Sequence, residues 1–219
     1  MSVTWSYSGL TKYEQCPRQY QKIYVTKETV DVGFDASNWG NRVHEALESR
    51  VRDGVALPEG MTQHEALAKT ILAATGDVYV EHKFAINRAF QPVAFDSPDR
   101  WCRGIADSLI VNCLKAVALD YKTGKIREGS DQLALMALMT FAHFPSVVVC
   151  DTAFIWLQFG KTTKERFQRS DIPTIWLRFL SRVKRLEVAY EQDKWLPNPT
   201  PLCKWCPCTR SQCEFSSKP

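Results

Sequence analysis

The sequence lacks the features that would place the protein in a membrane or on a secretory route. No stretch approaches the roughly 18 consecutive apolar residues of a membrane span. The first residues, Met-Ser-Val-Thr-Trp-Ser, contain no basic segment followed by an apolar run. Internal repeats and low-complexity tracts are also lacking. We therefore expect a protein without a secretion signal or a membrane partner, located in the cytoplasm.

A strong excess of charge of either sign is lacking as well. Lys and Arg number 28 and Asp and Glu number 24, which gives a formal net charge of +4. This mild excess is compatible with a polyanionic partner but is no evidence for one. Apolar residues make up 45% of the 219 residues and charged residues 24%, as is typical of a globular protein.

Apolar patterning predicts helices that alternate with strands. A helix is expected from Asn38 to near Gly54, with Trp39, Val43 and Leu47 at four-residue spacing. Capping boxes at Thr11 and Thr62 predict the starts of two further helices, one before and one after the helix from Asn38. Strands are expected at 78–86, 103–111, 116–122, 147–159 and 161–167, and further helices at 130–144 and from 173 onward. This order indicates a single α/β domain over residues 1–219, with a core of about 38–195.

Acidic residues stand in the two apolar strands between Arg103 and Lys125. Asp107 lies in the first strand, and Asp120 and Lys122 end the second, two positions apart and therefore on the same face. Carboxylates are costly to bury unless a cation or hydrogen bonds offset their desolvation. This combination suits a divalent metal and a phosphate. The alternative is a strand end at Asp107 and a surface ion pair between Asp120 and Lys122.

One histidine and one further acid could join these residues. His44 lies beside the apolar stripe of the helix expected from Asn38, and it precedes the strand acids that could share a metal with it. A hydrogen-bonded core histidine would show the same pattern. Glu81 lies in the strand expected at 78–86. It is either a supporting acid or a solvated strand carboxylate.

Eight cysteines are many for a chain of this size. Three of them, Cys102, Cys113 and Cys150, lie in apolar strand-like runs, where we expect reduced and buried thiols. The other five are one upstream residue and a cluster near the C-terminus: Cys16, Cys203, Cys206, Cys208 and Cys213. In a reducing cell this clustering favours a metal or iron–sulfur site over disulfides.

Several short motifs together resemble one known family. Gly-Asn-Arg-Val-His-Glu at 40–45, Gly-Ile-Ala-Asp at 104–107, Asp-Tyr-Lys-Thr-Gly at 120–124 and Gln-Leu at 132–133 occur in the order and rough spacing of the RecB-like PD-(D/E)XK nucleases. Segments 13–20 and 197–207 also look like theirs. The closest-looking members are the iron–sulfur exonucleases of CRISPR adaptation and the AddB-type nuclease domains. The resemblance spans nearly the whole chain.

The resemblance implies a fold and a metal site. The fold would be a restriction-endonuclease-like α/β core, with a central mixed sheet flanked by helices. His44, Asp107 and Asp120 would ligate Mn²⁺ or Mg²⁺, with the main-chain carbonyl of Tyr121 as a further ligand. An imidazole ligand favours Mn²⁺.

Two further roles follow from the same resemblance. Lys122 would orient the attacking water and stabilise charge on the phosphate. Gln132 matches a family position that contacts the substrate or groups of the active site. This sequence also departs from the family, because Met136 stands where a tyrosine is usual and Asp120 stands where many relatives have glutamate.

The cysteines resemble the cluster ligands of the same family. Cys16, Cys203 and Cys206 match directly, and Cys213 would be the fourth ligand, with Cys208 as its competitor. Four thiolates fit a [4Fe–4S] cluster and, by count alone, structural Zn²⁺. Either metal would join the N-terminal segment 1–25 to the C-terminal segment 196–215.

The resemblance therefore implies a metal-dependent deoxyribonuclease, acting as an exonuclease on single-stranded DNA or on DNA ends. The alternative is a catalytically inactive nuclease-like module that binds DNA or a partner protein. Such a module would serve an assembly of recombination, DNA repair or CRISPR adaptation. A nuclease directed at RNA also fits these residues.

Overall fold

The computed structural model describes residues 3–31, 35–126 and 131–218. It contains two compact units. The sheet unit comprises Phe34–Arg178, and the terminal unit comprises Met1–Gly33 together with Phe179–Pro219. That the two units form one domain stays a prediction.

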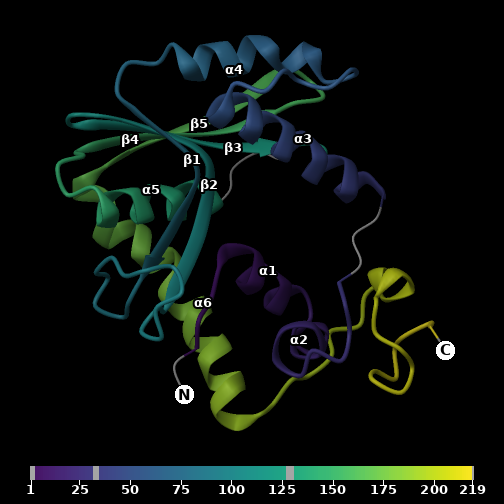
Figure 1. Ribbon diagram of the computed structural model, residues 1–219. Helices are drawn as coiled ribbons and strands as arrows, with labels where there is room; N and C mark the ends of the chain where they lie inside the picture. Colours follow the sequence, from purple (N-terminus) through teal and green to yellow (C-terminus); the bar gives the residue numbers. More distant parts are fainter. Residues whose placement is uncertain (1–2, 32–34, 127–130, 219) are drawn as a thin grey trace. The chain divides into compact units, whose positions relative to one another are not determined.

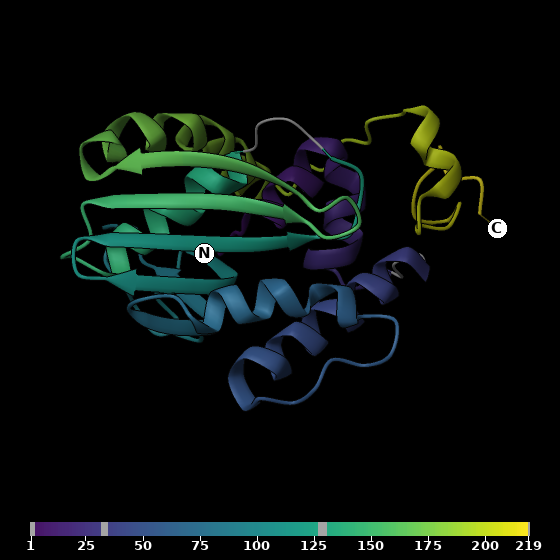
Figure 2. The same ribbon diagram turned by 90° about the horizontal axis from the view of Figure 1, so that it is seen from above.

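A five-stranded mixed sheet forms the centre of the sheet unit (Figure 2). Its strands, in spatial as well as chain order, are β1 (Asp77–Ile86), β2 (Cys102–Asn112), β3 (Lys115–Lys122), β4 (Val149–Trp156) and β5 (Lys161–Gln168). Neighbouring strands are antiparallel except for β3 and β4, which are parallel. A parallel pair needs a crossover connection, and helix α5 (Asp131–His143) lies between these two strands in the chain.

Helices cover both faces of this sheet (Figure 1). Helices α3 (Asp35–Asp53) and α4 (Glu65–Leu72) pack on one face, where Val43, Leu47 and Ile71 join a buried cluster with Ile110 and Tyr121 of the strands. Helix α5 packs on the other face and is buried on most sides from Leu133 to Phe141. Full burial of one valine, leucine or isoleucine side chain stabilises the fold by about 1.5–3 kcal/mol. The predicted restriction-endonuclease-like α/β fold is confirmed.

The terminal unit contains short helices and a group of aromatic side chains. Its elements are α1 (Tyr7–Gln15), α2 (Pro17–Tyr20), η1 (Gln21–Val25), the second part of α6 (Ile172–Gln192) and η4 (Pro201–Trp205). The ring of Tyr20 stacks on Trp195 with centroids 5.8 Å apart. Arg182 binds both carboxylate oxygens of Glu14 at 2.7 Å. These contacts join the start of the chain to its end.

Three local predictions are wrong. Helix α1 begins at Tyr7, because the Ser6 hydroxyl and not Thr11 accepts the capping hydrogen bond from the Gly9 amide at 3.2 Å. Helix α4 begins at Glu65 after a 3₁₀ turn (η2, Thr62–His64), so Thr62 is not its cap. Cys113 is exposed because it occupies the turn between β2 and β3, where its φ is 50°.

Among the described residues, no helix combines the length and the apolar character needed to cross a bilayer.

Candidate active site

The ladder between β1 and β2 is interrupted where Glu81 lies opposite Asp107. Regular pairing stops at Val80 and resumes at His82, so the two acids lie outside it. The φ of Glu81 is 51°, in the left-handed region that costs a non-glycine residue about 1–3 kcal/mol. Such interruptions of a ladder are frequent next to active sites, because they redirect side chains.

Helix α3 brings His44 to these acids. The neighbouring Val43 and the following Leu47 are buried in the core, which fixes the rotation of the helix about its axis. The Nδ1 atom of His44 then lies 3.1 Å from Oδ1 of Asp107. The ring of Tyr121 meets the imidazole edge to face, with centroids 5.6 Å apart. His44 is therefore held by a polar contact on one side and an aromatic contact on another.

Three potential ligand atoms converge at this point. One atom each from His44, Glu81 and Asp107 lies within 4.8 Å of the other two. Each of the three side chains is partly exposed, so an ion from solvent could reach them. One imidazole nitrogen and two carboxylate oxygens form a donor set that suits Mn²⁺ or Mg²⁺.

The second oxygen of Asp107 is fixed by the neighbouring strand. The backbone N–H of Tyr121 donates a hydrogen bond to Oδ2 of Asp107. The regular pairing of β2 with β3 ends at Ser108. Just beyond it, the Asp107 carboxylate takes the place of a backbone carbonyl as the acceptor for the Tyr121 N–H. The Tyr121 hydroxyl lies 2.8 Å from the Ser108 hydroxyl. The backbone hydrogen bond restricts the orientation of the Asp107 carboxylate, and the contact between the two hydroxyls holds the Tyr121 ring.

Asp120 and Lys122 form a second, adjoining group on β3. The Nζ atom of Lys122 lies 2.6 Å from Oδ1 of Asp120, and the Gln132 amide of α5 donates to Oδ2. The ammonium group also lies 4.9 Å from the centre of the Phe154 ring. Because Asp120 is only 6% exposed, this is not the surface ion pair that was the alternative.

The structure thus places the predicted site residues in two groups. His44 and Asp107 come together, and Glu81 joins them. The sequence alone left open whether Glu81 is a supporting acid or a solvated carboxylate. Asp120 is not among these converging atoms but is held by Lys122 and Gln132. Tyr121 contacts Asp107 through its amide. The ligand roles of Asp120 and of the Tyr121 carbonyl stay predictions.

Burial and neighbouring charges shift the pKa values of the site residues. Burial raises the pKa of Glu81, and the negative charge of Asp107 raises it further. Burial also raises the pKa of Asp120, against the opposing effect of the Lys122 ammonium. Burial lowers the pKa of His44, but its hydrogen bond with Asp107 and the surrounding negative charges outweigh this, so the net shift is upward. Shifts caused by burial together with specific charged neighbours are typical of functional sites.

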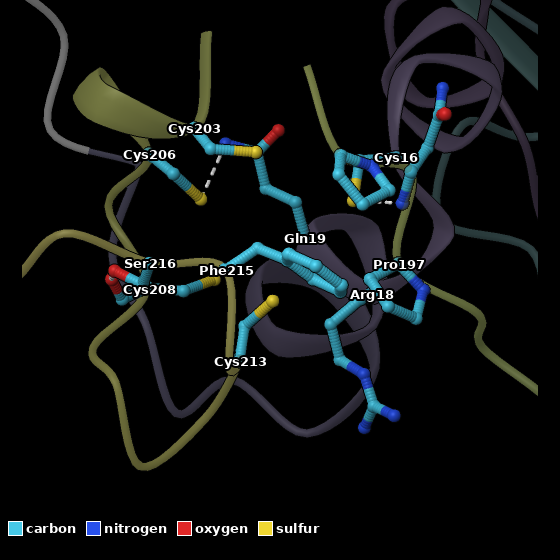
Figure 3. Close-up of a pocket in the computed structure, with 12 residues that line it drawn as sticks. Cys16, Arg18, Gln19, Pro197, Cys203, Cys206, Cys208, Cys213, Phe215 and Ser216 are labelled. Carbon is cyan, nitrogen blue, oxygen red and sulfur yellow. Dashed lines mark hydrogen bonds between the residues drawn. The ribbon is translucent and has the colours of Figure 1, made fainter. Parts of the chain in front are cut away.

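The terminal unit holds a second candidate site, a pocket lined by five thiols (Figure 3). They are Cys16 at the junction of α1 and α2 and four residues near the C-terminus: Cys203, Cys206, Cys208 and Cys213. The amide of Gln19 donates to Cys206 Sγ at 3.6 Å, and the backbone N–H of Asn198 donates to Cys16 Sγ at 3.5 Å. All five thiols are free.

This pocket also bears on the choice of the fourth predicted ligand. Burial raises the pKa of the Cys208 thiol, and the neighbouring Cys206 and Cys213 thiols raise it further. Cys208 and Cys213 both line the pocket, so the geometry leaves both as donors. By the chemistry of its donors, the pocket fits a [4Fe–4S] cluster or Zn²⁺.

Comparison with known proteins gives one family and a related fold. The sequence model of the PD-(D/E)XK nuclease superfamily matches residues 4–82, which include Cys16, His44 and Glu81. The crystal structure of a candidate exonuclease from Eubacterium rectale is similar with a TM-score of 0.56 and 13% identity, covering 92% of this chain and 86% of that one.

A second crystal structure, that of SSO0001, has a TM-score of 0.47 and 14% identity, covering 94% of this chain and 83% of that one. No curated protein matches the sequence. The family match over residues 4–82 and the α/β fold together confirm the resemblance to the PD-(D/E)XK nuclease superfamily.

Proposed function

We propose that the chain is a metal-dependent deoxyribonuclease that hydrolyses DNA phosphodiester bonds as an exonuclease on single strands or ends. The observation that carries this proposal is the convergence of His44, Glu81 and Asp107 next to the Lys122–Asp120 pair. The superfamily match supports nuclease activity. The name of the similar Eubacterium rectale protein supports the choice of an exonuclease.

His44, Glu81 and Asp107 would hold Mn²⁺ or Mg²⁺. When bound there, such a cation lowers the pKa of a water ligand and offsets negative charge on the phosphate. We keep Asp120 and the Tyr121 carbonyl as further proposed ligands, since the charge of Asp107 acts on the Asp120 carboxyl. The crowding of carboxylates supports the proposal, because their mutual repulsion is relieved when a divalent cation binds.

Lys122 would bind the scissile phosphate and orient the attacking water. Its ammonium group is held by Asp120 on one side and the Phe154 ring on another, so it loses little freedom when the substrate arrives. Gln132 limits the rotation of Asp120 and therefore positions Lys122 indirectly. The positive charge of Lys122 would stabilise the negative charge that builds up on the phosphate oxygens.

The five-thiol pocket would hold a [4Fe–4S] cluster, with structural Zn²⁺ as the alternative. Cys16, Cys203, Cys206 and Cys213 are the proposed ligands, and Cys208 competes with Cys213. The role is structural, because phosphodiester hydrolysis transfers no electrons. Anaerobic purification followed by iron, sulfide and zinc analysis separates the two metals.

Cleavage of end-labelled single-stranded DNA with and without Mn²⁺ tests the proposed activity. We expect Asp107→Asn and Lys122→Met to lower the rate at least about 100-fold. The matched control is Lys164→Met, at an exposed lysine of β5. This variant should cleave DNA at the wild-type rate. Stepwise release from one end indicates an exonuclease, and an RNA strand tested in parallel shows the sugar preference. Wild-type rates in both site variants would refute the assignment.

An inactive DNA-binding module remains the second candidate because of Met136. This side chain is buried in α5 and only 6% exposed, so it supplies no polar group where relatives have tyrosine. DNA binding without any metal-dependent cleavage by the wild type would favour this second candidate. Partners in recombination, DNA repair or CRISPR adaptation stay predictions.

A further inference from the structure

The face of the β1–β2 hairpin that carries Asp107 continues past the candidate active site. In Figure 1 the loop end of this hairpin extends beyond the part of the sheet that α3 and α4 cover. Along β2 the residues Arg103 and Ile105 are exposed and Asp107 is half-buried, while Cys102 and Ala106, at the alternate positions, are buried. Alternate residues of a strand share a face, so Arg103 and Ile105 lie on the same face as Asp107.

Lys83 of β1 completes this exposed face. It pairs with Ile105 across the ladder, and partners in an antiparallel pair point to the same side. At about 3.3 Å per residue, Lys83 lies about 7 Å along the strand from Glu81, and Arg103 lies about 13 Å from Asp107. Beyond the converging acids this face therefore carries Lys83 and Ile105 side by side, and then Arg103. We call Lys83, Arg103 and Ile105 the hairpin strip.

Phe95, from the loop between β1 and β2, holds the two cations of the hairpin strip. The Lys83 ammonium lies 5.5 Å from the centre of its ring, and the Arg103 guanidinium lies 5.6 Å from the same centre. A cation over an aromatic ring gains electrostatic stabilisation without losing its charge. Within the described part of the chain, neither cation forms an ion pair with a carboxylate. Both charges thus stay available to an external anion.

We propose that the hairpin strip binds the DNA strand next to the scissile phosphate and selects single-stranded DNA. This inference rests on the proposed nuclease function. Lys83 and Arg103 bind successive phosphates of the strand. Ile105, 45% exposed and directly opposite Lys83, offers an apolar surface to the face of an unpaired base, which a stacked duplex does not present. Phe95 acts as a positioning residue that keeps both cations in line.

Binding of a labelled 20-residue thymidine oligonucleotide, measured by fluorescence anisotropy without divalent metal over a range of salt concentrations, tests the strip. The variant Lys83→Gln/Arg103→Gln should bind about tenfold more weakly. Its slope of log affinity against log salt should fall by about 1.4, as expected for the loss of two contacts to single-stranded phosphates. The matched control Lys161→Gln/Lys164→Gln removes two exposed charges from β5, at the opposite edge of the sheet. It should stay within twofold of the wild type.

Unchanged affinity and slope in Lys83→Gln/Arg103→Gln would overturn the proposal. The single-strand preference is tested by Ile105→Ser, which should weaken binding to the single strand about tenfold and leave binding to duplex DNA unchanged. An equal loss for both substrates overturns that preference. Circular dichroism and urea unfolding confirm that each variant is folded.

Cleavage with Mn²⁺, measured on the same proteins, separates this proposal from the nuclease function. A wild type that cleaves, together with a Lys83→Gln/Arg103→Gln variant that binds and cleaves equally well, refutes the hairpin strip and leaves the nuclease intact. A wild type that binds DNA through Lys83 and Arg103 but does not cleave supports the strip and refutes the nuclease activity.

Discussion

Glu81 combines two unfavourable features in one residue. Its backbone is left-handed, with a φ of 51°, and its carboxylate is close enough to Asp107 for their charges to repel. Neither feature stabilises a strand, and a neutral residue of the same size would remove the repulsion. An arrangement that costs stability and gathers potential ligands is typical of a functional site.

The variant Glu81→Gln tests this view of the residue. It keeps the size of the side chain and removes its charge, so the metal-free protein should unfold at a higher temperature than the wild type. Added Mn²⁺ should stabilise the wild type and have a much smaller effect on the variant, because a ligand that binds only the folded state raises stability according to its affinity. Differential scanning fluorimetry with and without Mn²⁺ measures both effects. Equal metal-induced shifts in the two proteins would contradict a ligand role for Glu81.

Among the elements, helix α1 shows how a hydroxyl selects where a helix begins. Ser6 has an extended backbone and accepts the hydrogen bond of the Gly9 amide, as an N-cap does. Thr11 lies inside the helix, where its hydroxyl donates to the carbonyl of Tyr7 at 3.0 Å. We therefore expect Ser6→Ala to lower the free energy of unfolding by about 1 kcal/mol.

Thr11→Ala is the matched control for this cap. It should be neutral or slightly stabilising, because alanine has the higher helix propensity and Thr11 caps nothing. Urea unfolding followed by far-ultraviolet circular dichroism measures both variants. A larger loss in Thr11→Ala than in Ser6→Ala would show that the helix starts where the capping-box pattern predicts.

Helix α5 meets strand β1 through the half-buried side chain of His143. The Nε2 atom of His143 lies 2.9 Å from the carbonyl oxygen of Ala85, and the ring meets Phe84 edge to face at 5.1 Å. Burial lowers the pKa of His143 below the ordinary 6.5, and its bond to the Ala85 backbone offsets only part of this effect. The folded protein therefore favours the neutral imidazole.

Stability should consequently fall on the acid side. Above about pH 6.5 the imidazole is neutral in both states and the contribution is fully present. As the pH decreases through 6.5 toward the lower pKa of the folded state, the unfolded chain binds a proton that the folded chain does not, and the free energy of unfolding decreases. Urea midpoints at pH 7.5 and pH 5.5 should differ more for the wild type than for His143→Gln. The same difference in both proteins would remove His143 as the cause.

For the whole molecule, patterns of apolar residues predict the elements better than they predict the site. The strands around Asp107 and Asp120 follow from apolar runs broken by a short polar connection, and the structure has both, in β2 and β3. The position of Glu81 depends on a left-handed backbone and a break in the ladder. Neither feature has a signature in the sequence, since glutamate is not a residue that favours this conformation. The convergence of His44, Glu81 and Asp107 is therefore a property of the fold. The spacing of apolar residues alone could not decide the role of Glu81.

The terminal unit is made from the two ends of the chain. Its stability should therefore depend most on a metal bound in the five-thiol pocket, which would link these ends. Gln19 and Cys206 contact each other although 187 positions separate them. Folding such distant segments together costs chain entropy, and a metal bound by thiols from both ends would offset part of this cost.

We expect Cys206→Ser to lower the bound metal and the melting temperature together, and to expose the chain ends to proteolysis before the sheet unit. Cys113→Ser, at an exposed thiol outside the pocket, should change neither the metal content nor the melting temperature. Metal analysis, thermal unfolding and limited proteolysis of the two variants provide the measurements. A Cys206→Ser protein with the full metal content and stability of the wild type would show that the five thiols do not join the chain ends through a metal.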